Sequence, residues 1–164
     1  MARLRADQPL LPSVLDRLLD DDPTVSQETP KSRSQVLREL KLSVRRDLED
    51  LLNTRRRCKS WPEHLSELER SLVNYGIPDI TGLDLAAGRE RQGFARLLEG
   101  VIRRFEPRFK SVRVQMFENA DPLDRTLRFR IDALLRAEPA PEPVVFDSSL
   151  EPATGNVEIK GAGP

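Results

Sequence analysis

The sequence predicts an α+β fold in which N-terminal helices pack on a small, mostly antiparallel C-terminal sheet. Apolar side chains recur at every third or fourth position as far as Phe105, and from Val112 onward they alternate with polar ones. Clusters of proline, glycine and asparagine separate these runs. Helical patterns that come first and strand patterns that come later are typical of helices packed on one face of an antiparallel sheet.

The chain is expected to form one domain with short extensions, as is usual for 164 residues. In the N-terminal extension, residues 10–19 are predicted to form a short helix, because Leu11, Leu15 (or Val14) and Leu18 have helical spacing. We expect this helix to dock on the domain or on a partner. The predicted parts are an arm over residues 1–30, the domain over residues 31–160 and a tail over residues 161–164.

The first long helix is predicted to begin after Ser32. Residues 32–35 have the pattern of a capping box, in which Ser32 and Gln35 bond to each other's backbone. The helix is expected to end near Asn53, which tolerates the left-handed conformation of a C-terminal cap. Its buried stripe is predicted to consist of Leu37, Leu40, Val44, Leu48 and Leu51.

The middle of the chain is predicted to contain a basic loop, a short helix and a packed loop. Residues 54–59 include three arginines and a lysine, and we expect a solvated surface there, with an acidic partner as one alternative and a phosphate as another. A short helix is predicted from Trp61 to Leu72, and residues 74–82 are rich in turn formers.

The second half of the chain is predicted to form one long helix followed by strands. Apolar residues with helical spacing run from about Leu85 to Phe105, where Pro107 ends the helix. Alternating patterns then predict strands over residues 112–117, 126–133, 144–147 and 156–160.

Residues 105–109 lie between the last helix and the first strand. Because Pro107 pushes Glu106 toward an extended conformation, Glu106 and Arg108 are expected to share one side and the two flanking phenylalanines the other. The simplest packing places both rings in the core and the carboxylate beside the guanidinium on the surface. A surface ion pair of this kind contributes about 0–1 kcal/mol.

Composition excludes several classes of protein. With 27 basic and 27 acidic residues the net charge is zero, which argues against a dedicated nucleic-acid binder. Cys58 and His64 are the only residues of their kinds, so neither an internal disulfide nor a structural zinc site is expected. No run approaches the roughly 20 apolar residues of a membrane span, and the N-terminus lacks a signal-peptide pattern. We therefore expect a cytoplasmic protein without a cofactor.

Candidate catalytic groups are weak. His64 has no nucleophile nearby, and a reactive Cys58 would need a general base. A glycosidase needs two carboxylates across a cleft, and among 27 acidic residues finding a pair means little. We expect no enzymatic activity. The nominal candidates would be Glu106, Glu118, Asp121 and Asp124.

Four segments resemble one family. Residues 10–18, 43–56 and 71–79, together with the stretch Phe105-Glu106-Pro107-Arg108-Phe109, occur in the order found in the TssE family of type VI secretion baseplate subunits. This family is the bacterial relative of the small wedge protein of contractile phage-tail baseplates. The strands that follow resemble the family in pattern more than in motif.

The resemblance implies a structural protein, although the family is often labelled lysozyme-like. It would join wedge subunits, the tube hub and the first sheath ring at the inner face of the cell envelope, monomeric alone and in several copies once assembled. Glu106, Pro107 and Arg108 would form the assembly contact, and sheath subunits would attach by strand exchange. The last strands offer the edge for that exchange, through Val144, Phe146, Val157 and Ile159. The alternatives are a peptidoglycan-cleaving enzyme and a tail subunit of a phage-derived particle.

Overall fold

The computed structural model describes most of the predicted domain. The predicted tail beyond residue 161 and most of the predicted arm lie outside the described ranges, as do Cys58 and Asp121. Those ranges are residues 14–18, 32–57, 60–62, 64–80, 88–119, 124–137 and 140–161.

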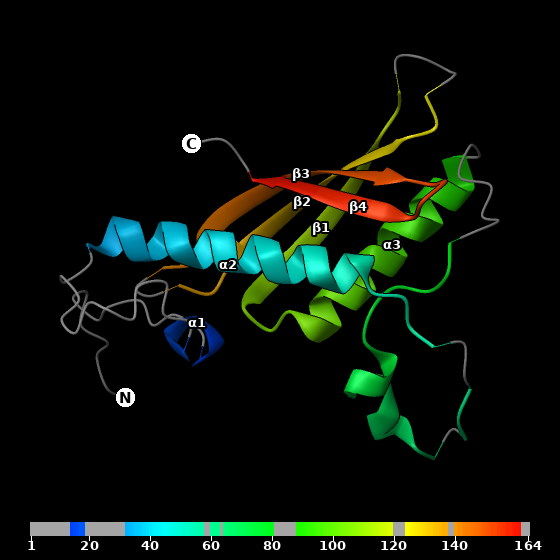
Figure 1. Ribbon diagram of the computed structural model, residues 1–164, viewed down its shortest axis with the longest axis horizontal. Helices are drawn as coiled ribbons and strands as arrows, with labels where there is room; N and C mark the ends of the chain where they lie inside the picture. Colours follow the sequence, from blue (N-terminus) through cyan, green and yellow to red (C-terminus); the bar gives the residue numbers. More distant parts are fainter. Residues whose placement is uncertain are drawn as a thin grey trace.

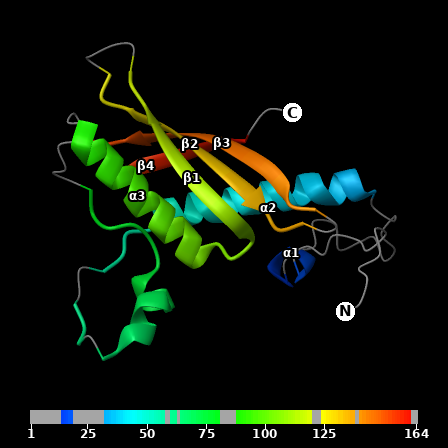
Figure 2. The same cartoon turned by 180° about the vertical axis from the view of Figure 1, so that it is seen from behind.

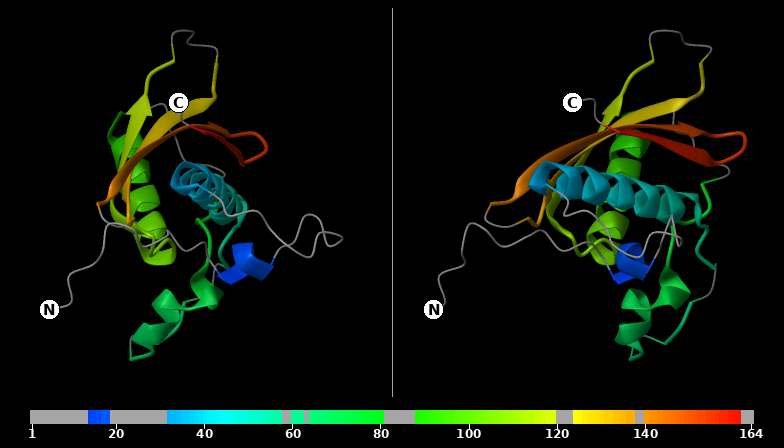
Figure 3. Two further views of the ribbon diagram at one scale, coloured as in Figure 1. Left: turned by 90° about the vertical axis from the view of Figure 1, so that its left-hand side faces the viewer. Right: turned by 60° about the vertical axis from the view of Figure 1, so that its left-hand side comes forward.

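Two long helices cover one face of a four-stranded antiparallel sheet, as the sequence predicts (Figure 1). Helix α2 (Arg33–Asn53) packs against β4 (Asn156–Gly161), and helix α3 (Gly88–Phe105) packs against β1 (Phe109–Phe117). The strand order is β1-β2-β3-β4, so every neighbour in the sheet is also the next strand along the chain. Figure 3 shows both long helices on the same side of the twisted sheet.

The sheet is built from alternating sequences that bury one face. Strand β2 (Leu127–Leu135) places Phe129 and Ile131 in the core, and β3 (Glu142–Glu151) adds Phe146 and Leu150. Ile131 lies between Val114 of β1 and Phe146 of β3, which fixes the register across three strands. The opposite face carries charged side chains, among them Arg128, Arg130 and Asp147.

Helix α2 begins and ends where the sequence predicts, but its C-terminal cap differs from the prediction. The capping box is present, with the Ser32 backbone N–H donating to the Gln35 side chain at 2.7 Å and Gln35 N–H donating back to the Ser32 hydroxyl at 3.4 Å. Asn53 is the last helical residue, and the residue after it, Thr54, is extended. The left-handed cap predicted at Asn53 is wrong, because no non-glycine residue of the described chain has a positive φ.

The asparagine side chain instead extends the hydrogen bonding of the sheet. Asn53 Nδ2 donates to the Val157 carbonyl at 2.9 Å, and Val157 N–H donates to Asn53 Oδ1 at 2.8 Å. At the opposite edge, Val114 N–H donates to Glu99 Oε1 of α3 at 2.8 Å. Helix side chains therefore satisfy two backbone groups of β4 at one edge of the sheet and one backbone group of β1 at the other.

The segment between the long helices differs from the predicted short helix. It contains two 3₁₀ helices, η1 (Ser66–Arg70) and η2 (Leu72–Asn74), which stand away from the sheet (Figure 2). Leu65 is 41% exposed and Leu72 is 84% exposed, so the apolar pattern that predicts a helix has no core to pack against. A helix of that length without a packed face is marginal in water, and only short turns form.

Candidate functional site

A tight turn joins α3 to β1 and carries the Glu-Pro-Arg motif. Glu106 N–H still donates to the Ile102 carbonyl at 2.8 Å, and Phe109 N–H donates back to the Glu106 carbonyl at 3.3 Å. Pro107 occupies the second position of this turn, where its fixed φ is favourable. Pro107 and Arg108 form the centre of this turn, so the segment is not extended throughout as the predicted alternation requires. The turn, rather than strand alternation, brings Glu106 and Arg108 to the same side.

The two phenylalanines that flank the motif both pack inward, but only Phe109 lies in the core as predicted. Phe109 is in the core at 6% exposure. Phe105 is half-buried and contacts the edge of the Tyr75 ring, with ring centroids 5.3 Å apart and an angle of 70° between the planes. Such edge-to-face pairs are favourable beyond the area that they bury. The motif is thus held between two anchored rings.

Glu106 is buried, which corrects the expectation of a surface ion pair. Its side chain is only 5% exposed, whereas that of Arg108 is 22% exposed. Arg108 donates from Nε to Glu106 Oε1 at 2.7 Å and from Nη2 to Oε2 at 2.5 Å, and its backbone N–H adds a bond of 3.1 Å to Oε1. The carboxylate is therefore fully paired within the motif, because a buried charge is tolerated only when it is paired and hydrogen-bonded.

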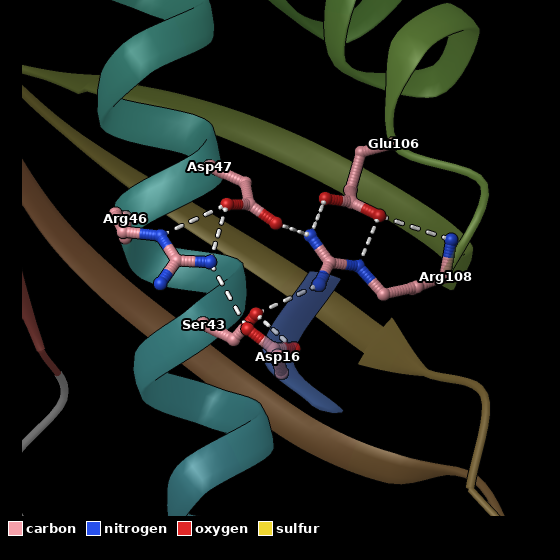
Figure 4. A network of polar contacts seen from close by, with 6 residues as sticks. All are labelled: Asp16, Ser43, Arg46, Asp47, Glu106 and Arg108. Carbon is pink, nitrogen blue, oxygen red and sulfur yellow. Dashed lines mark hydrogen bonds and ion pairs between the residues drawn. The ribbon is translucent and has the colours of Figure 1, made fainter. Parts of the chain in front are cut away.

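The motif belongs to a larger cluster, which we call the polar junction and which Figure 4 shows. Arg108 also donates to Asp47 Oδ2 at 2.5 Å and to the Ser43 hydroxyl at 3.1 Å, so the guanidinium reaches from the turn to α2. The Ser43 hydroxyl in turn donates to Asp16 Oδ2 at 2.7 Å, and this carboxylate belongs to α1 (Val14–Leu18). The polar junction consists of Asp16, Ser43, Arg46, Asp47, Glu106 and Arg108.

Arg46 completes the junction and holds α1 in place. Its Nη2 donates to Asp16 Oδ1 at 3.0 Å and to Asp47 Oδ1 at 3.2 Å. These bonds confirm that the short helix docks on the domain, one of the two outcomes expected for it. Sequence reasoning missed Ser43 and Asp47 as site residues. Their spacing of four on a helix was a usable signal, since it places both on one face.

The polar junction carries more negative than positive charge. Three carboxylates against two guanidinium groups leave one formal negative charge. Burial alone would lower the pKa of Arg108, but hydrogen bonds to Glu106 and Asp47 and the charges of both carboxylates raise it well above its ordinary value. Burial, followed by the charges of Asp50, Asp47 and Glu106, raises the pKa of Tyr75. Arg108 therefore stays cationic, and the one excess formal negative charge of the junction suits a cation on a partner.

A shallow hollow of about 410 Å³ opens beside the motif, and we call it the motif hollow. Asp47 and Arg108 contribute partly exposed side chains to it, at 32% and 22%, and Pro107 is exposed on its rim. Glu106 lies behind the guanidinium. A partner can therefore reach Arg108 and Asp47, while Glu106 positions the arginine. The hollow is lined by Asp47, Leu51, Tyr75, Phe105, Glu106, Pro107 and Arg108.

Among the nominal catalytic carboxylates, the three that the structure describes do not form a pair across this hollow. Glu118 and Asp124 flank the β1–β2 connection, at the end of β1 away from Glu106. Hydrogen bonds from Thr126, and then the charge of Arg128, lower the pKa of Asp124, which makes it a poor acid near neutral pH. No three metal-ligating side chains gather within the described residues. No helix among them is long and apolar enough to cross a membrane.

The four strand residues predicted to offer a sheath contact all point into the core. Each is at most 5% exposed, so their side chains are not available to a partner. Strand β3 is also longer than predicted and lies inside the sheet, paired with β2 along its length. Only its second part pairs with β4, from Phe146 to Glu151, which leaves residues 142–145 beyond the end of β4. At this edge, a partner could therefore bind only to main-chain groups and not to these four side chains. The residues concerned are Val144, Phe146, Val157 and Ile159.

The polar junction joins α1, α2 and the α3–β1 turn of a small α+β domain, and it lies beside an open hollow. Comparison with known families identifies the class of this domain. A family model described as baseplate wedge protein gp25 matches residues 38–140, which is more than half of the chain. The chain belongs to this family and is therefore a component of a phage-tail-like baseplate. No curated protein and no solved structure matches it significantly.

Proposed function

We propose that this protein is a structural baseplate subunit of a type VI secretion machine. It joins wedge subunits, the tube hub and the first sheath ring, and it works in the cytoplasm at the inner face of the envelope. Its membership of the wedge family and the four TssE-like segments support this proposal. The single observation that carries the site is the Glu106–Arg108 pair, built into a turn whose outer side chains line an open hollow.

In the proposed contact Arg108 and Asp47 touch the wedge partner, and Glu106 acts behind them. The bidentate pair fixes the guanidinium plane, so less side-chain freedom is lost when a partner binds. The excess negative charge of the junction favours a lysine or arginine of the partner against Asp47. Binding would desolvate the exposed parts of both side chains, and truncating such a pair typically costs about 2–5 kcal/mol of affinity.

The sheath contact is proposed to use the backbone of the free sheet edge. Val157 turns its N–H and carbonyl away from β3 and toward Asn53, so the alternation of antiparallel pairing turns those of Ile159 and Gly161 outward too. An extended arm of a sheath subunit can pair with these groups, or it can continue the line of β4 and pair with residues 142–145 of β3. Main-chain hydrogen bonds then supply the affinity.

The wedge contact is tested with a variant that keeps the fold. Arg108→Ala alone would strand a buried carboxylate, so Glu106→Leu and Arg108→Met are combined, because well-packed apolar replacements of a buried pair are often neutral for stability. We expect this double variant to melt near the wild-type temperature yet not to co-purify with the wedge subunits or support secretion. Arg128→Met on the open face of the sheet is the matched control. If the folded double variant assembles normally, the motif is not part of the wedge contact.

The alternative functions are separated by simple observations. Neighbouring genes for a disaggregase ATPase and a membrane complex would indicate secretion, and tail genes alone would indicate a phage-derived particle. We propose that the protein has no hydrolase activity. A zymogram with peptidoglycan beside a known muramidase tests this, and lysis abolished by one carboxylate substitution would contradict it.

A further inference from the structure

Two arginines after helix α2 are left without partners inside the described part of the chain. Arg55 is structural, since its guanidinium donates to the Leu52 carbonyl at 3.1 Å and also to the carbonyl of Gly155. Arg56 uses its backbone N–H, which donates to the Ile77 carbonyl at 2.9 Å. The side chains of Arg56 and Arg57 make no hydrogen bond or ion pair with any described residue.

Hollows lie on both sides of this arginine pair. One, of about 410 Å³, is lined by Thr54, Leu72, Val73 and Tyr75 together with the arginines. The other, of about 480 Å³, reaches Trp61. Leu72 is 84% exposed and Val73 is 51% exposed, so apolar surface meets unpaired positive charge. We call this the basic–apolar surface; it consists of Arg56, Arg57, Trp61, Leu72, Val73 and Tyr75.

The segment that displays Leu72 and Val73 is held in shape by its own hydrogen bonds. Asn74 is 7% exposed, and its Nδ2 donates to the Glu69 carbonyl at 3.0 Å. Ile77 N–H donates to the Thr54 carbonyl at 2.9 Å. Gly76 has a φ of 100°, and a Cβ there would collide with the same carbonyl. The apolar side chains are thus presented by a formed loop, which lowers the ordering cost of binding.

We propose that the basic–apolar surface binds an acidic segment of a baseplate partner, with carboxylates against Arg56 and Arg57 and apolar side chains against Leu72 and Val73. The identity of the partner rests on the proposed function. Charge complementarity selects the occupant, because the only described carboxylate that lines either hollow is that of Glu69, which pairs with Arg104 at 3.9 Å. Exposed apolar patches of this kind mark interaction sites.

A protein segment fits this surface better than a nucleic acid. Phosphate binding is dominated by cations, whereas four of the six residues of this surface are leucine, valine or aromatic. The chain as a whole has no net charge. Tyr75 lines both the motif hollow and the hollow that contains Leu72 and Val73, so the two sites adjoin. One partner can occupy both, with its basic groups toward Asp47 and its acidic groups toward Arg56 and Arg57.

Photo-crosslinking tests where the surface binds. A benzophenone amino acid replaces Leu72 in the full-length chain, and the variant is mixed with purified wedge subunits from the same gene cluster. We expect a crosslink to a peptide that contains several aspartates or glutamates beside apolar residues. A crosslink to a basic peptide, or none in a complex that still forms, overturns the inference and leaves the proposed function standing. If the wild-type chain binds no wedge subunit, both fall.

Charge reversal tests how the surface binds. Arg56→Glu with Arg57→Glu should weaken binding roughly tenfold, since two rim contacts become repulsive, and the loss should shrink at high salt. Arg38→Glu with Arg96→Glu, on exposed helix positions, is the matched control and should bind normally. Arginines placed at the crosslinked acidic positions of the partner should restore binding. Unchanged affinity in folded Arg56→Glu/Arg57→Glu, or tight arginine-dependent binding to a DNA or RNA 20-mer, overturns the inference.

Discussion

Removal of the Arg108 guanidinium should destabilise the free subunit far more than removal of an exposed arginine. Arg108→Ala deletes the two guanidinium bonds to Glu106, whose side chain is 5% exposed, together with the bonds to Asp47 and Ser43, while the backbone N–H bond to Glu106 remains. Breaking a fully buried ion pair costs about 3–5 kcal/mol. Because Arg108 is itself 22% exposed, water can replace part of the lost solvation. We expect a loss of about 2–4 kcal/mol in the free energy of unfolding.

Urea unfolding followed by circular dichroism measures this loss, and thermal melting should show a shift of roughly 5–15 °C for a chain of this length. Arg128→Ala is the matched control, because it removes an ion pair whose arginine is 62% exposed and should cost under about 1 kcal/mol. Glu106→Leu added to Arg108→Ala should recover part of the loss by removing the stranded charge. If Arg108→Ala and Arg128→Ala cost the same, Glu106 is hydrated and the buried junction is not a stabilising element.

Three further predictions address the core, the tyrosine beside the polar junction and the sheet edge. Ser148→Ala should be neutral or stabilise by about 1 kcal/mol in urea unfolding, because the Ser148 hydroxyl is buried without a described partner; a clear loss would mean that the hydroxyl is bonded. Tyr75 is the only tyrosine, so its absorbance near 295 nm should titrate above the ordinary range, and Asp50→Asn should lower that midpoint. A raised tyrosine pKa stabilises the fold below the unfolded pKa, and this contribution disappears as pH rises through the folded one. Gly161→Pro should leave the core intact, because the N–H that it removes points away from β3, yet it should weaken sheath nucleation; normal nucleation would move the sheath contact elsewhere.

The fold was predictable because each main element has a regular face. Strand β2 alternates over its whole length, and the stripe on α2 returns at steps of three or four, so both patterns point to a core. The segment around Leu72 was mispredicted for the opposite reason. Its leucines have helical spacing, but tertiary packing leaves them exposed, and spacing alone does not report burial.

The candidate site was predictable only in part. Their spacing of two positions in the sequence suggested that Glu106 and Arg108 would pair, and they do. Their burial depends on Asp47 and Ser43, which lie 61 and 65 positions earlier in the chain and meet the turn only through the packing of α2. A local sequence pattern does not show which residues from distant parts of the chain meet in the fold. The burial of this pair could therefore be seen only in the structure.

The side-chain amide of Asn53 creates an energetic barrier to the addition of another strand at β4. It occupies the N–H and the carbonyl of Val157 as a neighbouring strand would, so a newcomer that pairs with Val157 must break two bonds. Each is worth only about 1 kcal/mol net, because a displaced amide can turn to water. A transient encounter with one or two backbone bonds gains nothing there, whereas a long arm that pairs over many residues more than recovers the loss. If sheath subunits attach by strand addition, as proposed, this barrier would disfavour premature pairing between copies of the free subunit and would still admit a long sheath arm.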